Sequence, residues 1–202
     1  LHTFLQEQLA AVPVAKANYD KLKQIKTKEF DFGDYKIYVH FNPARAVSSL
    51  AKLDAKSIAE RPCFLCAKNR IEGQTAIDFK EKYDICINPF PICDEHFTVV
   101  SKIHEPQSIE GKVRDFLDLA KQYPDFIALF NGAKSGASAP DHMHFQLVNK
   151  DYFPFAIETP MPGVVEKIVL CSNNAEELEA KVNAQLESLQ REGELPASHT
   201  NL

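Results

Sequence analysis

Asn131-Gly-Ala-Lys-Ser-Gly-Ala-Ser-Ala-Pro-Asp-His-Met-His-Phe-Gln146 is the stretch that decides how this sequence folds. Its second half alternates polar and apolar residues, and the polar ones are His142, His144 and Gln146. Because successive side chains of a strand point to opposite faces, we expect a strand over 142–148. Two imidazoles and a carboxamide would then share one face, and the apolar residues between them would face the core. The alternative is a solvent-exposed strand face, since polar groups are costly to bury without partners.

The first half of this stretch is a loop of small residues over 131–140. It contains two glycines, three alanines, two serines and Lys134. Small side chains leave backbone N–H groups uncovered, which favours the binding of an anion. The loop is not of the Walker type, because Lys134 follows Ala133 and no glycine stands at the required upstream position. A flexible turn between two strands is the alternative interpretation.

Outside this stretch, the hydrophobic periodicity predicts an α+β fold with a mostly antiparallel sheet and helices packed on it. The expected helices cover 3–24 in two pieces split at Pro13, then 108–123 with a cap at Ser108, and a last helix capped at Asn173 or Asn174. The expected strands are a hairpin over 28–41 and single strands over 83–88, 96–101, 126–130 and 164–170.

The 202 residues, of which 45% are hydrophobic and 25% charged, have the composition of an ordinary globular protein. We expect an N-terminal helical segment over 1–25, one domain over 26–191 and a tail over 192–202. There is no run of 18 uncharged apolar residues, so we expect no membrane span, and the first residues resemble no signal peptide. A net charge of −5 argues against nucleic-acid binding. Five cysteines, an odd number, favour a reducing compartment, the cytoplasm.

Cys63-Phe-Leu-Cys66 is a pair that fits a redox site, a zinc knuckle or chance. The redox interpretation requires a helix N-terminus after a strand, whereas Arg61-Pro62 precedes the pair and no strand leads into it. A tetrahedral zinc site needs two more ligands. Cys86 lies in an apolar strand and is expected in the core. Histidines at strand edges or starts are the better ligands, and these are His96, His104, His142 and His144.

The loop followed by His-x-His-x-Gln resembles the histidine-triad superfamily, and the glutamine marks its transferase and phosphorylase branch. That branch includes galactose-1-phosphate uridylyltransferase, diadenosine tetraphosphate phosphorylase and the GDP-sugar phosphorylases. The closest resemblance is to a bacterial group related to the last of these. Four further segments are similar. Residues 63–69, followed by Gly73, resemble the zinc-knuckle region, and 83–90 resemble the nucleotide-pocket strand. Residues 96–104 resemble the strand with its following histidine, His104, and 41–45 resemble an Asn-Pro segment.

The resemblance implies a histidine-triad-like fold and a nucleotidyltransferase or phosphorylase that works through a nucleotidyl-histidine intermediate on His144. Gln146 and Ser138 would complete the catalytic group. Residues expected to bind the nucleotide or its phosphates are Asn88, Asn131, Lys134, Gly136, Ala137 and Arg45. The substrate would be a nucleoside diphosphate sugar or a dinucleoside polyphosphate, with phosphate or a sugar phosphate as acceptor, and the protein would be a homodimer.

The resemblance also implies a structural zinc ion held by Cys63, Cys66, His104 and His142. The spacing C-x2-C-x37-H-x37-H is too long for a zinc finger and suits a site that ties three segments together. His96 is the alternative for the third ligand.

Larger members of the superfamily carry a second, similar half for which this chain is too short. A non-catalytic nucleotide-binding module without the acceptor half is therefore one alternative function. A zinc-stabilised interaction domain is the other.

Overall fold

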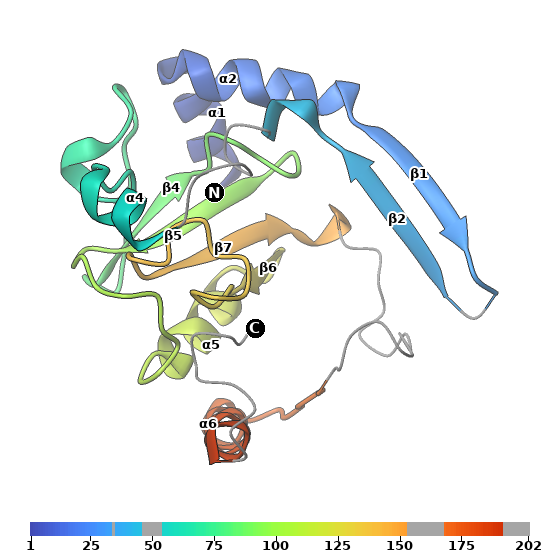
Figure 1. The fold of residues 1–202 in the computed structure, drawn as a ribbon, viewed down its shortest axis with the longest axis vertical. Coiled ribbons are helices and arrows are strands. Elements are labelled where there is room, and N and C mark those ends of the chain that lie inside the picture. Colours follow the sequence, from blue (N-terminus) through green and yellow to red (C-terminus); the bar gives the residue numbers. More distant parts are fainter. Residues whose placement is uncertain (34, 46–53, 153–167, 192–202) are drawn as a thin grey trace.

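The computed structural model describes residues 1–33, 35–45, 54–152 and 168–191 (Figure 1). Its centre is a five-stranded sheet in the order β3-β4-β5-β7-β6, and every pair of neighbouring strands is antiparallel. The strands are β3 Ile77–Phe79, β4 Tyr83–Ile87, β5 His96–Ser101, β6 Phe126–Leu129 and β7 His144–Asn149.

One face of this sheet forms the hydrophobic core. Met143, Phe145 and Leu147 are each 0% exposed there, as the alternation of the sequence predicted. Helices cover this face with their apolar residues: Leu5 of α1 and Leu119 of α5 belong to the same core cluster. The helices are α1 His2–Ala11, α2 Pro13–Asp20, α4 Ala55–Glu60, α5 Val113–Gln122 and α6 Ala175–Arg191.

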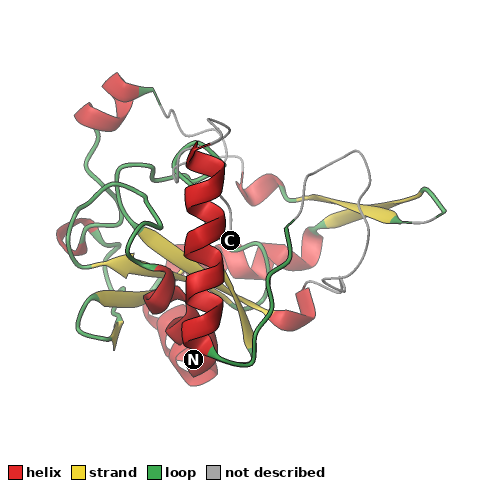
Figure 2. Ribbon diagram, turned by 90° about the horizontal axis from the view of Figure 1, so that it is seen from below, coloured by secondary structure: helices red, strands yellow, loops and turns green. Residues whose placement is uncertain are grey.

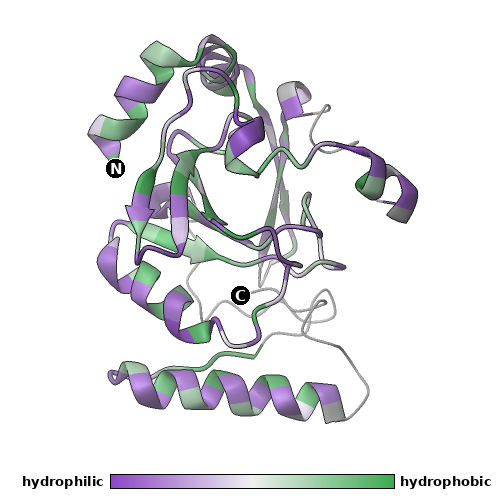
Figure 3. Ribbon diagram, turned by 90° about the vertical axis from the view of Figure 1, so that its left-hand side faces the viewer, coloured by the Kyte–Doolittle hydropathy of each residue, from purple (hydrophilic) through white to green (hydrophobic). Residues whose placement is uncertain are grey.

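Helix α6 carries both hydrophilic and hydrophobic residues, as Figure 3 shows. Its N-terminus is capped by Asn174, whose Oδ1 accepts from the N–H groups of Glu176 and Glu177. Leu186 is buried against the core. The predicted cap of the last helix is thus confirmed at Asn174. The described residues also form short 3-10 helices: η1 Lys21–Gln24, η2 Pro43–Arg45, η3 Ala67–Asn69 and η4 Lys150–Tyr152.

The predicted hairpin is also present, as β1 Lys26–Asp31 and β2 Lys36–Phe41 in antiparallel register. It extends away from the five-stranded sheet in both views (Figures 1 and 2). Val39 and Phe41 are exposed on it. The hairpin is followed by η2, which ends at Arg45.

The mixed α+β architecture with an antiparallel sheet is therefore confirmed, but two predicted boundaries are wrong. β7 begins at His144 and not at residue 142, because His142 N–H donates to Ala139 O and closes a turn before the strand. α5 begins at Val113 and not near residue 108, because Gly111 has φ +69°, outside the helical region.

The remaining expectations concern chain segments. Of the strand expected over 164–170, the first four residues lie outside the described residues, and 168–170 form no strand. The tail over 192–202 lies outside the described residues. In the N-terminal segment the two predicted helical pieces are present, and Leu5, Val12 and Tyr19 pack into the common core. The division of the chain at residue 25 remains a prediction.

Candidate active site and metal-ligand cluster

A cavity of about 730 Å³ lies on the sheet face opposite the core. Its floor consists of alternate residues of four strands, because every second side chain of β4, β5, β6 and β7 points to this face. These floor residues are Cys86, Thr98, Val100, Leu129, His144 and Gln146. Its walls include Phe64 and Leu65 between the two cysteines, Ile71, and Pro89 and Phe90 after β4. The cavity thus combines an apolar wall with a floor that carries the polar side chains of Thr98, His144 and Gln146.

His144 is only 4% exposed, and one hydrogen bond of its ring determines which ring nitrogen carries the proton. Its Nδ1 lies 2.8 Å from the carbonyl oxygen of His142. A carbonyl can only accept, so Nδ1 carries the proton and Nε2 keeps its lone pair. Burial lowers the pKa of His144, which favours the neutral ring. The ring therefore offers an unprotonated nitrogen on the residue that lines the cavity.

Gln107 holds the backbone of His144 in place, and no pattern in the sequence indicated this. Its side chain accepts from His144 N–H at 2.7 Å and donates to His144 O at 3.0 Å. It also donates to Asn131 O at 2.8 Å. Because β6 ends at Leu129, the Gln107 carboxamide pairs with His144 as a neighbouring strand would. Gln107 therefore ties the start of the loop to the first residue of β7.

The loop contributes Asn131, Gly136 and Ser138 to the cavity. Gly136 has φ +96°, a left-handed conformation that favours glycine. Within the described residues, the N–H groups of Gly136 and Ser138 donate to no protein acceptor. They are therefore available to an anion in the cavity.

Two other loop residues lie apart from the cavity. Lys134 is exposed and does not line it. Ala137 N–H donates to Gly132 O at 3.4 Å, and its side chain is 1% exposed. A part for these two residues in phosphate binding remains a prediction.

Arg45 and Asn88 approach the cavity from the other side. Arg45 Nη1 donates to Phe90 O at 3.0 Å, which keeps the guanidinium next to the apolar wall. Burial lowers the pKa of Arg45, although an arginine keeps its charge at neutral pH. Asn88 Nδ2 donates to Thr98 Oγ1 at 3.2 Å. The structure thus brings both predicted binding residues to the same cavity as His144.

Gln146, a partly buried residue of the cavity floor, is hydrogen-bonded to the buried His96. His96 is 1% exposed, and its Nε2 lies 2.7 Å from Gln146 Oε1. Burial lowers the pKa of His96 to about 4. His96 was an alternative metal ligand in the sequence, but this pairing places it beside Gln146 instead.

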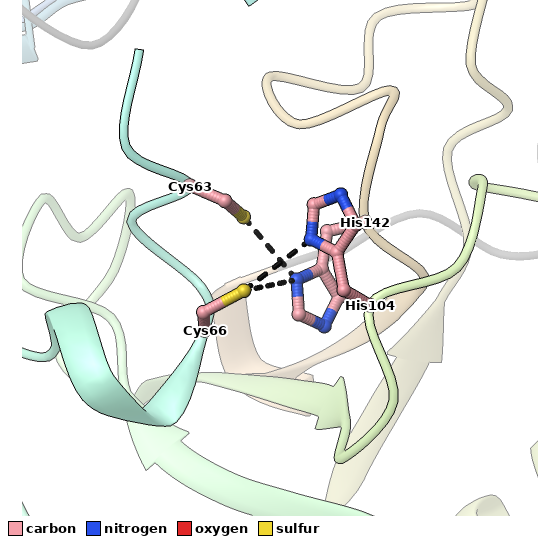
Figure 4. A group of neighbouring side chains, drawn as sticks. All are labelled: Cys63, Cys66, His104 and His142. Carbon is pink, nitrogen blue, oxygen red and sulfur yellow. Dashed lines mark hydrogen bonds between the residues drawn. The ribbon is translucent and has the colours of Figure 1, made fainter. Parts of the chain in front are cut away.

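The second feature is a cluster of Cys63, Cys66, His104 and His142, whose ligand atoms all lie within 4.8 Å of one another (Figure 4). Cys63 Sγ lies 3.2 Å from His142 Nδ1, and Cys66 Sγ lies 3.3 Å from His104 Nδ1. Ligand atoms held tetrahedrally at about 2.0–2.3 Å from a zinc ion are separated by roughly 3.3–3.8 Å. The four side chains therefore have the chemistry and the spacing of a Cys2His2 metal site.

The hydrogen bonds around the cluster agree with a metal-binding arrangement. His142 Nε2 lies 2.8 Å from Ser101 O and so donates to it, which leaves the lone pair on Nδ1 for the cluster. Burial raises the pKa of the Cys63 thiol, so a cation is needed to hold it as thiolate. The structure brings together the four ligands that were expected and directs His142 to the cluster, away from the cavity that His144 lines.

An ion pair that the sequence did not reveal supports this cluster. Arg61 Nη2 lies 2.5 Å from Asp141 Oδ1, and Asp141 Oδ2 lies 4.0 Å from His104 Nε2. The Arg61 guanidinium also lies 4.8 Å from the centre of the Phe64 ring. The only sequence signal for Arg61 and Asp141 was that Arg61 lies two residues before Cys63 and Asp141 directly before His142. The pair links the cysteine segment to the histidine segment next to the cluster.

No helix among the described residues is long and apolar enough to cross a membrane.

Comparison with solved structures found similarity to yeast Ap4A phosphorylase Apa2. In complex with Ap4A, that protein matches with 17% identity and a TM-score of 0.41, over 67% of this chain and 50% of its own. In complex with AMP, it matches with 18% identity and a TM-score of 0.36, over 70% of this chain and 49% of its own. The chain therefore spans about half the length of the structures it matches.

Comparison with curated proteins gave no match. Residues 4–149, which include the cavity and the cysteine–histidine cluster, match the model of a family described as a domain of unknown function, DUF4922. This match covers most of the chain, which therefore belongs to the DUF4922 family.

Proposed function

We propose that this protein transfers a nucleotidyl group through a covalent intermediate on His144, as a nucleotidyltransferase or phosphorylase. The substrate class is a nucleoside diphosphate sugar or a dinucleoside polyphosphate, and the acceptor is phosphate or a sugar phosphate. One observation carries this proposal: the hydrogen bond from His144 Nδ1–H to His142 O leaves an unprotonated Nε2 on a cavity-lining residue. A neutral imidazole with a fixed lone pair is a competent nucleophile.

The reaction has two displacements at one phosphorus atom. His144 Nε2 attacks the α-phosphorus, the new P–N bond forms, and the P–O bond to the leaving phosphate breaks with its electron pair. The acceptor phosphate oxygen then attacks the same phosphorus, and the P–N bond returns its electron pair to Nε2. The first step releases a phosphate as a stable anion, and the second releases the neutral imidazole of His144. Neither step therefore needs a proton from Gln146.

The residues around His144 suit the charge that develops on phosphorus. Gln146 and the free N–H groups of Gly136 and Ser138 can donate to its non-bridging oxygens, and preorganised donors of this kind lower the barrier. Arg45 would bind a further phosphate oxygen. The apolar wall at Phe64 and Phe90 suits the flat face of a base.

We assign the cysteine–histidine cluster to a structural zinc ion held by Cys63, Cys66, His104 and His142. Four protein ligands complete a tetrahedron and leave no open position for catalysis. The ion would fix the backbone at His142, whose carbonyl orients the His144 ring. A homodimer and a cytoplasmic location remain predictions.

The test is the covalent intermediate itself. The protein is incubated with a panel of nucleoside diphosphate sugars and dinucleoside polyphosphates without acceptor, and its intact mass is measured at neutral pH. One nucleoside monophosphate should add to the parent and not to His144→Ala. His2 is exposed and does not line the cavity, so His2→Ala should react like the parent.

The outcomes separate the alternative functions. Nucleotide binding without an adduct from any donor would identify a non-catalytic binding module. The absence of both an adduct and a nucleotide-induced rise in melting temperature would instead favour an interaction domain.

A further inference from the structure

The buried ring of His96 has its proton on a defined nitrogen. Ile92 N–H lies 3.2 Å from His96 Nδ1. A backbone N–H can only donate, so Nδ1 accepts and carries no proton. With its pKa near 4, the ring is neutral at pH 7 and holds a single proton, which must then be on Nε2.

This proton determines how the Gln146 carboxamide is oriented. His96 Nε2 lies 2.7 Å from Gln146 Oε1, so the Nε2–H group donates to the amide oxygen. If the carboxamide were flipped, its NH2 group would face the Nε2–H group of His96, so two donors would meet without an acceptor. Asn88 Nδ2, which lies 3.3 Å from the same His96 nitrogen, donates to Thr98 Oγ1 and so does not compete for the Nε2–H group. Among the described residues, the hydrogen-bond partner of Gln146 Oε1 is therefore one donor, His96 Nε2–H.

The orientation has a chemical consequence for the cavity. Gln146 lines the cavity, and its oxygen is bonded to His96, so the NH2 group is the part of the carboxamide left to a ligand. An NH2 group attracts a phosphate oxygen, whereas an amide oxygen at the same place would repel it. A glutamine that could rotate freely would present the wrong group part of the time.

We propose that His96 is a positioning residue that holds the Gln146 carboxamide with its NH2 group directed at the phosphate of the bound nucleotide. This inference rests on the proposed function, because it gives a role in catalysis to the orientation of Gln146. His96 itself touches no substrate, since its Nε2–H is bonded to Gln146 and its Nδ1 to Ile92.

The first test is spectroscopic and needs no substrate. In protein with 15N-labelled histidine, the pattern of two-bond N–H correlations reports which ring nitrogen is protonated. His96 should be the Nε2–H tautomer at pH 7, and its signal should stay neutral down to pH 5. A His96 ring protonated on Nδ1, or charged at pH 7, would overturn the inference whether or not the protein is an enzyme.

The second test asks whether His96 acts through Gln146. Loss of one preorganised donor costs on the order of 100-fold in rate, so Gln146→Ala should lower kcat by about that factor. His96→Leu should lower kcat by about 10-fold with little change in KM, and His96→Gln, which can still donate, should recover most of it. In the double variant His96→Leu, Gln146→Ala, the loss should equal that of Gln146→Ala alone. Losses that multiply in the double variant would mean that His96 supports the fold only.

Tyr19→Phe is the matched control. The Tyr19 hydroxyl donates to the backbone oxygen of His96 at 2.9 Å, so this variant disturbs the same point of β5 without touching the ring. It should lower the melting temperature and leave kcat unchanged. If Tyr19→Phe lowered kcat as much as His96→Leu, the effect of His96 would be a general loosening of the strand, and the positioning role would be refuted.

Discussion

The buried neutral ring of His96 should make the protein sensitive to mild acid. The pKa of this histidine falls from its ordinary 6.5 to about 4 in the folded state. Between these two values the unfolded chain binds a proton at this site and the folded chain does not, so stability rises with pH across this window. The stabilisation is fully present above pH 6.5 and is lost as the pH falls towards 4. From pH 7 to pH 5 the loss at this one site is about 2 kcal/mol.

The measurement is urea unfolding at pH 7 and pH 5 for the parent and for His96→Gln, whose side chain does not titrate. All other groups, including the cysteine–histidine cluster, are shared by the two proteins, so their contributions cancel in the comparison. The parent should lose about 2 kcal/mol more than the variant over this interval. Equal losses in the two proteins would refute the argument, because they would show that His96 accepts a proton in the folded state as easily as in the unfolded one.

Three further predictions concern the cluster, the two histidines before and in β7, and the core. The double variant Cys63→Ser, Cys66→Ser should lose its zinc by elemental analysis and melt at a lower temperature, and full zinc retention would contradict the assignment of the cluster. His144→Ala should keep its zinc and most of its stability but form no nucleotidyl adduct, whereas His142→Ala should lose zinc; the reverse pattern would exchange the two roles. In a His144→Gly variant, added imidazole should restore part of the transfer activity. Phe145→Ala, at a core position with 0% exposure, should lower the free energy of unfolding in urea by about 3–5 kcal/mol, and a loss under 1 kcal/mol would show that this position is not packed as described.

The sequence predicted those features that depend on local periodicity. The alternation through Met143, Phe145 and Leu147 identified the core face of β7, and this face is fully buried. The beginning of α5 was less predictable, because helical spacing continues back to Ile109 while the left-handed Gly111 ends the regular geometry. The spacing of apolar residues indicates which of them could share one face of a helix. Whether the helix extends to those residues depends here on one backbone angle, the φ of Gly111.

Contacts between segments that are distant in the sequence could not be predicted from the periodicity of the residues. Gln107 pairs with the backbone of His144 only because β6 ends two residues before the loop reaches Asn131. His96 meets Gln146 only because β5 and β7 are neighbours with Thr98 opposite Gln146. Neither partner has a sequence signature, since a glutamine or a histidine in such a place is equally compatible with the surface, the core or a metal site.

The two histidines of β7 and its preceding turn show how one local change separates two functions. In an uninterrupted strand, His142 and His144 would point to the same face and compete for the same surroundings. The turn closed by His142 N–H to Ala139 O ends this equivalence, and the His142 ring joins the cysteines while His144 lines the cavity. The His142 carbonyl still accepts from His144 Nδ1–H, so the residue in the cluster orients the residue in the cavity. A metal ion that fixed His142 would therefore also fix the lone pair of His144, and loss of zinc should reduce transfer even where the fold survives.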